Sequence, residues 1–188
     1  MSLVLYDFDT AKLQAARTCS GVSVAQIACA VGVTERAVNL WLAGTRMPVP
    51  EVLPRLAVAV GTTPAGLCTV EAERLVHLRV FTGRTRAQMA DALEMAEKTY
   101  RLLESTGCVG RGARSRYSPG AGGWLPWEAW AAPAYRVTPE RLAAATEASR
   151  AFDRQAHEER WEQIREADPG LAARYDTVVH DIRMGGRS

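Results

Sequence analysis

The chain has 188 residues, of which 47% are hydrophobic, and its formal net charge is +2. These values exclude a disordered polyampholyte, and no apolar run reaches the roughly 20 residues that a membrane span needs. The four cysteines form no C-x-x-C pair and have no histidine at ligand spacing, so no disulfide framework, zinc site or redox motif is indicated. No targeting segment is recognisable. We expect a reduced, cytoplasmic protein without metal or cofactor.

The basic side chains are unevenly divided, with 21 Arg and only two Lys. A planar guanidinium suits phosphate and guanine recognition. The 31 Ala beside the Arg excess favour a simpler explanation, GC-rich codon usage. By segment, the net charge is +1 over residues 1–68, +3 over 69–150 and −2 over 151–188. The excess of positive charge therefore lies in the middle of the chain.

Apolar periodicity predicts helices almost everywhere and no clear strand, so the expected fold class is all-α. Capping residues and glycines divide the first 68 residues into short helices. The first expected helix runs from Asp9 or Thr10 to about Thr18, and the second is opened by the Ser23–Gln26 capping box and ended by Gly32 at positive φ. Thr34 caps a third helix over 35–43. A fourth helix is expected over 51–60, and Thr63-Pro64 begins a short fifth one.

Residues 24–43, VAQIACAVGVTERAVNLWLA, carry the most specific pattern in the chain. Ala28 stands where two helices must approach closely, Gly32 stands in the turn between them, and Trp41 is on an inward face. With the Thr-Pro helix that follows, residues 13–67 resemble the Xre/Cro family of lambda-repressor-like domains. The resemblance implies a helix-turn-helix DNA-binding domain over residues 1–68. A generic helical bundle is the alternative.

The same pattern recurs 62 residues later, where 85–90 align with 23–28 and 97–102 with 35–40. Residues 137–142 echo 62–67 at an offset of 75, which places an insertion at 107–123. We therefore predict a second, helix-turn-helix-like domain over residues 69–188. Glu94 replaces the turn glycine, and since a positive φ is unfavourable for Glu, we expect a wider turn or less regular helices there.

Two further helices are predicted at the end of the chain, over 139–167 and 171–184, separated by Asp168-Pro169-Gly170. An apolar stripe early in the first of them predicts that these carboxy-terminal helices (139–184) fold back on the second domain; dimerisation through them is the alternative. Trp124, Trp127 and Trp130 resemble a partner patch, but their place in the second copy favours core packing.

In a helix-turn-helix, the second helix presents side chains to base edges in the major groove, and the start of the first helix meets phosphates. Arg36 can bond guanine and Asn39 adenine, each with two hydrogen bonds. Glu35 either accepts from cytosine or only favours the helix start. The expected DNA-contacting residues of the first copy are Ser23, Gln26, Thr34, Glu35, Arg36, Asn39 and Arg46.

The second copy offers a different set of side chains, so it would read different bases. Its expected contacts are Arg84, Thr85, Arg86, Gln88, Glu97, Lys98 and Arg101. The insertion adds Arg111, Arg114 and Arg116 in a stretch without acidic residues. It is interpreted either as a Gly-rich arm that enters a minor groove or as an ordinary mobile loop.

Two unlike recognition helices would let one monomer read an asymmetric double-stranded site. This layout is similar to the immunity repressors of temperate actinobacterial phages, mycobacteriophages included, which maintain lysogeny, so we expect a DNA-binding transcriptional repressor. No catalytic constellation is recognisable and an enzyme is not expected. The alternatives are a homodimeric host or plasmid regulator on a palindrome, and an antitoxin or adaptor whose second domain binds protein.

Overall fold

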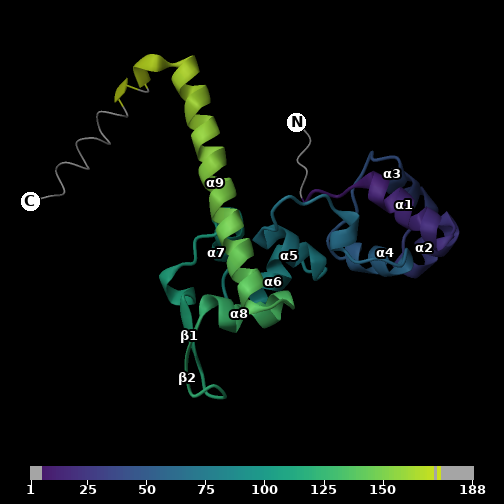
Figure 1. The fold of residues 1–188 in the computed structure, drawn as a ribbon, viewed down its shortest axis with the longest axis horizontal. Helices are drawn as coiled ribbons and strands as arrows, with labels where there is room; N and C mark the ends of the chain where they lie inside the picture. The colour runs from purple at the N-terminus through teal and green to yellow at the C-terminus, as the bar shows by residue number, and fades with distance from the viewer. Residues whose placement is uncertain (1–5, 172, 175–188) are drawn as a thin grey trace, which may run out of the picture. The chain divides into compact units, whose positions relative to one another are not determined.

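The computed structural model describes residues 6–171 and 173–174. The chain divides into two compact units, Met1–Arg150 and Ala151–Ser188. Most of the described residues are helical, and they contain one two-stranded sheet (Figure 1). The expected helical class is confirmed at this coarse level, and the sheet is an exception to it.

The first 68 residues form short helices that begin where the capping residues predict. Asp9 accepts hydrogen bonds from the amides of Ala11 and Lys12, and the Ser23–Gln26 capping box is complete. The helices are α1 (Thr10–Ser20), α2 (Val24–Val31), α3 (Glu35–Leu42), α4 (Leu53–Ala59) and the 3-10 turn η1 (Ala65–Leu67). Two predictions need correction. Helix α4 begins two residues later than expected, and its N-cap residue, Val52, makes no side-chain hydrogen bond. The last element is only a 3-10 turn.

Three helices follow with the same order and spacing. They are α5 (Leu75–Phe81), α6 (Arg86–Ala92) and α7 (Glu97–Thr106). The predicted capping box of α6 is present, since the Thr85 hydroxyl accepts from the Gln88 amide and the Gln88 side chain accepts from Thr85. Six buried positions recur at an offset of 62 residues: Leu13 and Leu75, Ile27 and Met89, Ala28 and Ala90, Val31 and Leu93, Val38 and Tyr100, Trp41 and Leu103.

The turns that join α2 to α3 and α6 to α7 have the same backbone geometry. Gly32 has a φ of 75° and Glu94 a φ of 52°, so both lie in the left-handed region. The expectation of a wider second turn is therefore wrong: Glu94 adopts the strained conformation itself. The closing bonds also match, from the Val33 amide to the Ala28 carbonyl and from the Met95 amide to the Ala90 carbonyl, both 3.0 Å.

Two hydrophobic clusters form the interior of the first unit, and α5 contributes to both. Val80 packs in the first cluster with α1–α4, whereas Leu75 and Leu78 pack in the second with α6, α7 and later elements. We call α1–α4 the first helix group and α6–α8 the second helix group. Because the seven-residue helix α5 packs in the cores of both, the two helix groups share a rigid element.

The predicted insertion is an ordered hairpin, which corrects the expectation of a Gly-rich arm or mobile loop. After the 3-10 turn η2 (Arg111–Ala113), strand β1 (Ser115–Ser118) pairs antiparallel with β2 (Gly123–Pro126), and Tyr117 lies opposite Trp124. Each strand has only four residues, too few for alternation to be visible in the sequence. Figure 1 shows the hairpin extending from the start of α8 (Trp127–Tyr135).

The three tryptophans of this region have different environments, so the prediction of core packing holds for only part of the cluster. Trp127 is buried and Trp130 is half-buried, but Trp124 is 70% exposed on β2. The next helix, α9 (Pro139–Ala167), has the predicted bounds. Its first turns bury Leu142 and Ser149 against the second cluster, as expected.

Further along α9, Phe152 is 51% exposed, so the buried part of the helix is confined to its first turns. The predicted helix over 171–184 lies outside the described residues apart from 171, 173 and 174. Within the part of the chain that the structure describes, no helix combines the length and the apolar character that crossing a membrane requires.

Candidate nucleic-acid interface

Helix α3 has one buried and one exposed face. Val38 and Trp41 are in the core, while the Thr34 hydroxyl caps the helix by accepting from the Ala37 amide at 3.2 Å. Arg36 and Asn39 are exposed, three residues apart on the outer face. All seven side chains predicted in the first copy are exposed: Ser23, Gln26, Thr34, Glu35, Arg36, Asn39 and Arg46.

The capping boxes leave hydrogen-bond donors at the starts of α2 and α6. The Ser23 hydroxyl oxygen accepts from the Gln26 amide at 3.2 Å, and the Gln26 side-chain oxygen accepts from the Ser23 amide at 2.8 Å. Thr85 and Gln88 repeat this arrangement at 3.1 and 2.9 Å. Since the boxes use only acceptor oxygens, the hydroxyl hydrogens and side-chain NH2 groups remain able to donate to an anion.

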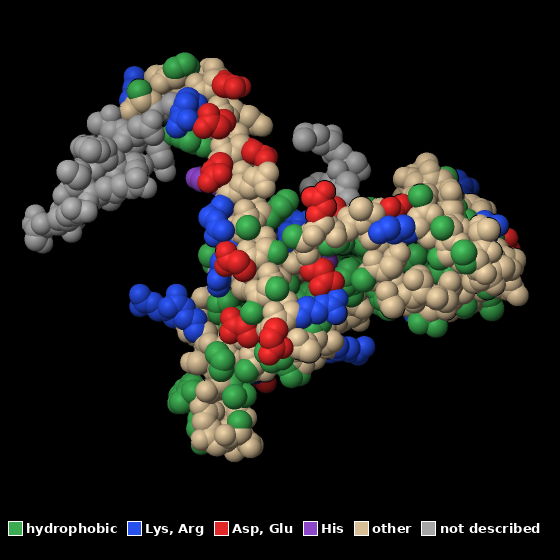
Figure 2. Space-filling model, in the orientation of Figure 1, with side chains coloured by type: hydrophobic (Ala, Val, Ile, Leu, Met, Phe, Trp, Pro, Cys, Tyr) green, Lys and Arg blue, Asp and Glu red, His purple; other side chains and the backbone are tan. Residues whose placement is uncertain are grey.

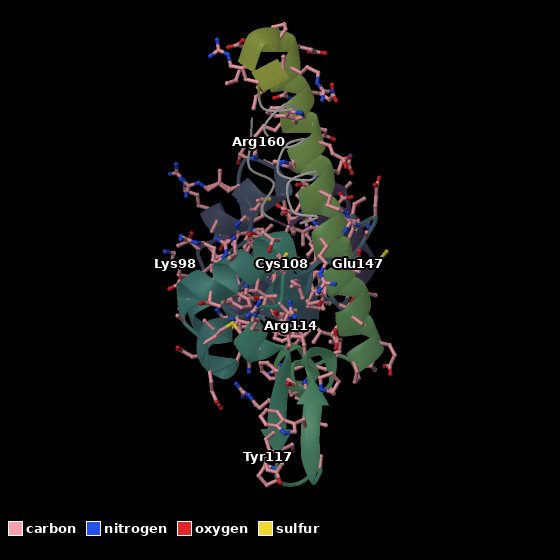
Figure 3. The ribbon with its side chains drawn as sticks, turned by 90° about the vertical axis from the view of Figure 1, so that its left-hand side faces the viewer. Lys98, Cys108, Arg114, Tyr117, Glu147 and Arg160 are labelled. Carbon is pink, nitrogen blue, oxygen red and sulfur yellow. The ribbon has the colours of Figure 1, made fainter. Side chains whose placement is uncertain are left out.

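Helix α7 repeats the division of α3 with different side chains outside. Tyr100 and Leu103 are buried, and Glu97, Lys98 and Arg101 are exposed. Leu102 is 60% exposed beside them. A shallow groove runs along this outer face, lined by Lys98, Thr99, Arg101, Leu102 and Ser105. Figure 3 shows Lys98 extending sideways from the fold.

Two of the predicted phosphate contacts are already bonded inside the second helix group. The Arg84 guanidinium donates to the Ala134 carbonyl at 2.6 Å, and Arg86 Nε donates to Glu104 Oε2 at 2.7 Å. Arg84 is only partly exposed, and its guanidinium contacts Met89 of α6 as well as Ala134 of α8. Both side chains therefore have a structural role that the sequence pattern does not reveal.

Glu104 is the centre of a buried polar network that sequence reasoning missed. It is 4% exposed and accepts from Arg79 Nε at 2.5 Å as well as from Arg86 and the Tyr100 hydroxyl. Burial raises the pKa of Tyr100 far above its usual value. The 62-residue repeat could have indicated this network. It aligns Glu104 with the apolar Leu42, and a charged side chain at such a position requires partners.

The three arginines of the insertion differ in what they contact. Arg111 and Arg114 are exposed near the base of the hairpin, where Arg114 also donates weakly to the Val109 carbonyl at 3.5 Å. Arg116 is half-buried and donates to the Leu93 carbonyl at 3.1 Å. It pairs with Glu94 at 3.3 Å, and its guanidinium lies 4.2 Å from the centre of the Trp130 ring. Arg116 therefore fastens the hairpin to the turn before α7.

His77 and Cys68 are the buried histidine and the buried cysteine of the part of the chain that the structure describes, and both have structural surroundings. His77 is buried, accepts from the Arg74 amide at Nδ1 and contacts Asp7 at Nε2. Burial raises the pKa of the Cys68 thiol to about 12, which makes it unreactive at neutral pH. Among residues 6–171 and 173–174, no three His, Cys, Asp or Glu side chains gather in a way that could hold a metal ion.

Comparison with known proteins found no match to any family model, any curated protein or any solved structure.

Proposed function

We propose that the protein is a sequence-specific double-stranded DNA-binding transcriptional repressor that uses α2–α3 and α6–α7 as two helix-turn-helix units. The observation that carries this proposal is the repeated turn. Both helix pairs close with equivalent backbone bonds and with a left-handed residue at the same position, and both leave a polar face of the second helix exposed. A helix presented in this way fits the width of the major groove.

The two exposed faces favour reading of unlike bases by one chain. Arg36 and Asn39 supply bidentate partners for guanine and adenine, whereas α7 offers Lys98 and Arg101. Because both helix groups pack against α5, one monomer would hold the recognition helices α3 and α7 in a fixed register on an asymmetric site. Such binding would repress by occluding promoter or transcribed DNA. The immunity repressor of a temperate actinobacterial phage, acting in the cytoplasm to maintain lysogeny, is the narrower form of this proposal.

The first experiment is selection of binding sites from a pool of random DNA duplexes with the full-length protein. We expect an asymmetric motif longer than the half-site of one helix-turn-helix, and a free protein that sediments as a monomer. A palindromic motif with a dimer in solution would instead indicate a homodimeric host or plasmid regulator. Failure to enrich any duplex would overturn the proposed function.

Substitutions then assign each part of the motif to one reader. In the double variants Arg36→Ala/Asn39→Ala and Lys98→Ala/Arg101→Ala, we expect affinity for the selected duplex to fall about 10- to 100-fold or more and discrimination to be lost at different base pairs. Arg160→Ala, an exposed arginine in α9, is the matched control and should bind normally. Unchanged binding by the α7 variant would favour the adaptor, in which the second unit binds protein.

A further inference from the structure

The hairpin carries two large aromatic side chains that are mostly outside any core. Tyr117 is 54% exposed and Trp124 is 70% exposed. They lie opposite each other across the strands with their ring centres 5.9 Å apart in an edge-on arrangement. Figure 3 shows Tyr117 towards the free end of the hairpin, and Figure 2 shows hydrophobic side chains along the hairpin. An aromatic pair ordered in this way is a preformed contact surface.

The base of the hairpin is held firmly against the second helix group. The Trp127 amide donates to the Arg114 carbonyl at 2.8 Å, and the Trp130 indole donates to the Ala113 carbonyl at 3.0 Å. Arg116 adds its bonds to Leu93 and Glu94 in the turn before α7. Two of these anchors are at α8 and the third is at the turn before α7, so the aromatic pair is already positioned and binding would order little additional chain.

The hairpin flanks the exposed face of α7. Thr99 of α7 and Arg116 of β1 line one small pocket, which places the insertion along that side of the helix. Lys98 and Leu102 line the neighbouring groove on the outer face of the same helix. A ligand lying along α7 would therefore extend towards the insertion.

Charge indicates which kind of ligand suits this surface. Residues 105–127 contain three Arg and no Asp or Glu, and Arg111 and Arg114 are exposed beside the hairpin. A polyanion satisfies those charges, and the sugar edges of a DNA minor groove offer apolar surface to aromatic side chains. A protein partner would need its own acidic surface around an apolar centre.

We propose that the hairpin is a separate DNA-contacting element, which places Tyr117 and Trp124 against the sugars of the minor groove next to the major groove entered by α7. This inference rests on the proposed function, since it requires α7 to lie on DNA. It assigns to residues 115–126 a role in affinity beyond the two recognition helices. Arg116 acts as a positioning residue that fixes the hairpin to the α6–α7 turn.

The test compares the full-length protein with Tyr117→Ala, Trp124→Ala and the double variant on the duplex that the wild-type protein selects. We expect the double variant to bind about tenfold more weakly, because apolar area buried by two aromatic rings is lost. Hydroxyl-radical cleavage, which reports on sugars in the minor groove, should lose one edge of its protected region. Phe152→Ala, another exposed aromatic truncated outside the hairpin, is the matched control and should bind as the wild type does.

Each remaining outcome contradicts the hairpin proposal in a distinguishable way. If the wild type selects a duplex and the double variant binds it equally well with the same protected sugars, the hairpin proposal is wrong and the proposed function stands. If the substitutions change only the self-association of the free protein in sedimentation, the aromatic pair is an interface with a second copy. If the wild type selects no duplex, both proposals fail. Because both side chains are exposed, thermal unfolding should be unchanged in every variant.

Discussion

The helix pairs α2–α3 and α6–α7 have the same turn geometry and different interiors. At six equivalent buried positions both contain apolar or aromatic side chains, and the turn bonds agree to within a few tenths of an ångström. At a seventh position the pairs differ in kind, because Leu42 of the first corresponds to Glu104 of the second. The comparison teaches that the turn geometry is maintained by the local bonds of the turn, while a position beside the core can change from an apolar side chain, the half-buried Leu42, to a buried charge if that charge is paired.

The charged interior of the second pair connects elements that the first pair does not have. Glu104 bonds to Arg79 of α5 and Arg86 of α6, and through Tyr100 it reaches Tyr135 of α8, whose hydroxyl donates at 3.3 Å. Replacement of a paired buried charge by an apolar side chain leaves its partner without compensation. The second core should therefore be the more sensitive to a single substitution.

The largest effect is expected for Glu104→Leu, which gives the second pair the residue of the first. Arg79, whose side chain is 3% exposed, would keep a buried positive charge without its carboxylate. We expect the free energy of unfolding to fall by about 3–5 kcal/mol. Chemical denaturation followed by circular dichroism measures the change.

The double variant Arg79→Met/Glu104→Leu is the control for this prediction. It removes both buried charges and leaves Arg86, 42% exposed, to be hydrated. We expect most of the lost stability to return, since a well-packed apolar pair often replaces a buried ion pair at little cost. If the losses of the single variants Arg79→Met and Glu104→Leu simply add in the double variant, the network does not act as a unit.

The turns of the two helix pairs can also be compared by substitution, at Gly32 in the α2–α3 turn and at Glu94 in the α6–α7 turn. A Cβ at Gly32 would meet only Arg55 Nη1 at 3.7 Å, an ordinary contact, so Gly32→Ala tests the left-handed backbone alone. We expect a loss of about 1–2 kcal/mol in unfolding free energy, measured by thermal or chemical denaturation. In the second turn Glu94 already bears this strain, and the Arg116 guanidinium on the Leu93 carbonyl helps to hold it.

Glu94→Gly is the matched control. It relieves the left-handed strain and removes an ion pair whose partners are 38% and 76% exposed, so we expect a small gain in stability. A loss on Glu94→Gly as large as that on Gly32→Ala would mean that the Glu94 side chain, and not the backbone, stabilises the second turn.

The sequence predicts features whose causes are local. Capping boxes, the turn glycine and the bounds of α9 depend on residues within a few positions of one another, and all of them are present. The 62-residue repeat also identifies α3 and α7 as the helices with an exposed polar face. Which bases those faces would read depends on partners that the chain alone does not contain.

Features that depend on distant partners could not be predicted. Glu104 can be buried because Arg79 and Arg86, 25 and 18 residues away in the sequence, donate hydrogen bonds to its carboxylate. Arg116 appears in the sequence as one more arginine of a basic arm, yet its bonds to the α6–α7 turn convert that arm into an anchored hairpin. Four-residue strands carry too little alternation to be recognised before this anchor is known.

The starts of the first helices, α1 and α5, provide a comparison by pH. Asp9 caps α1, and its pKa is lowered mainly by the hydrogen bond from Thr69, so that cap is lost only in acid below the ordinary value of 3.8. At α5 the Arg74 amide donates to His77 Nδ1, so the ring is neutral and its Nε2 proton points to Asp7. Burial, with a contribution from the Arg74 charge, lowers the pKa of His77 below 6.5 against the opposing effect of Asp7 and Glu73.

The smallest effect should therefore appear on mild acidification and only at α5. Because the unfolded chain binds the His77 proton more readily than the folded one, stability is complete above pH 6.5 and declines as the pH falls below it. The loss should be limited to about one hydrogen bond, on the order of 0.5–1.5 kcal/mol. Hydrogen exchange at pH 7 and pH 5, corrected for intrinsic rates, should show weaker protection of α5 amides at the lower pH and no change in α1.

His77→Gln is the variant that decides whether the histidine ring causes this difference. Gln26 and Gln88 accept the same capping bond at the same position of α2 and α6, so a glutamine at 77 can cap α5 without titrating. We expect α5 in this variant to keep its pH 7 protection at pH 5. If the α5 amides of the variant lose as much protection at pH 5 as those of the wild type, the pH response originates in another titrating group. The His77 cap would then not explain the difference between α1 and α5.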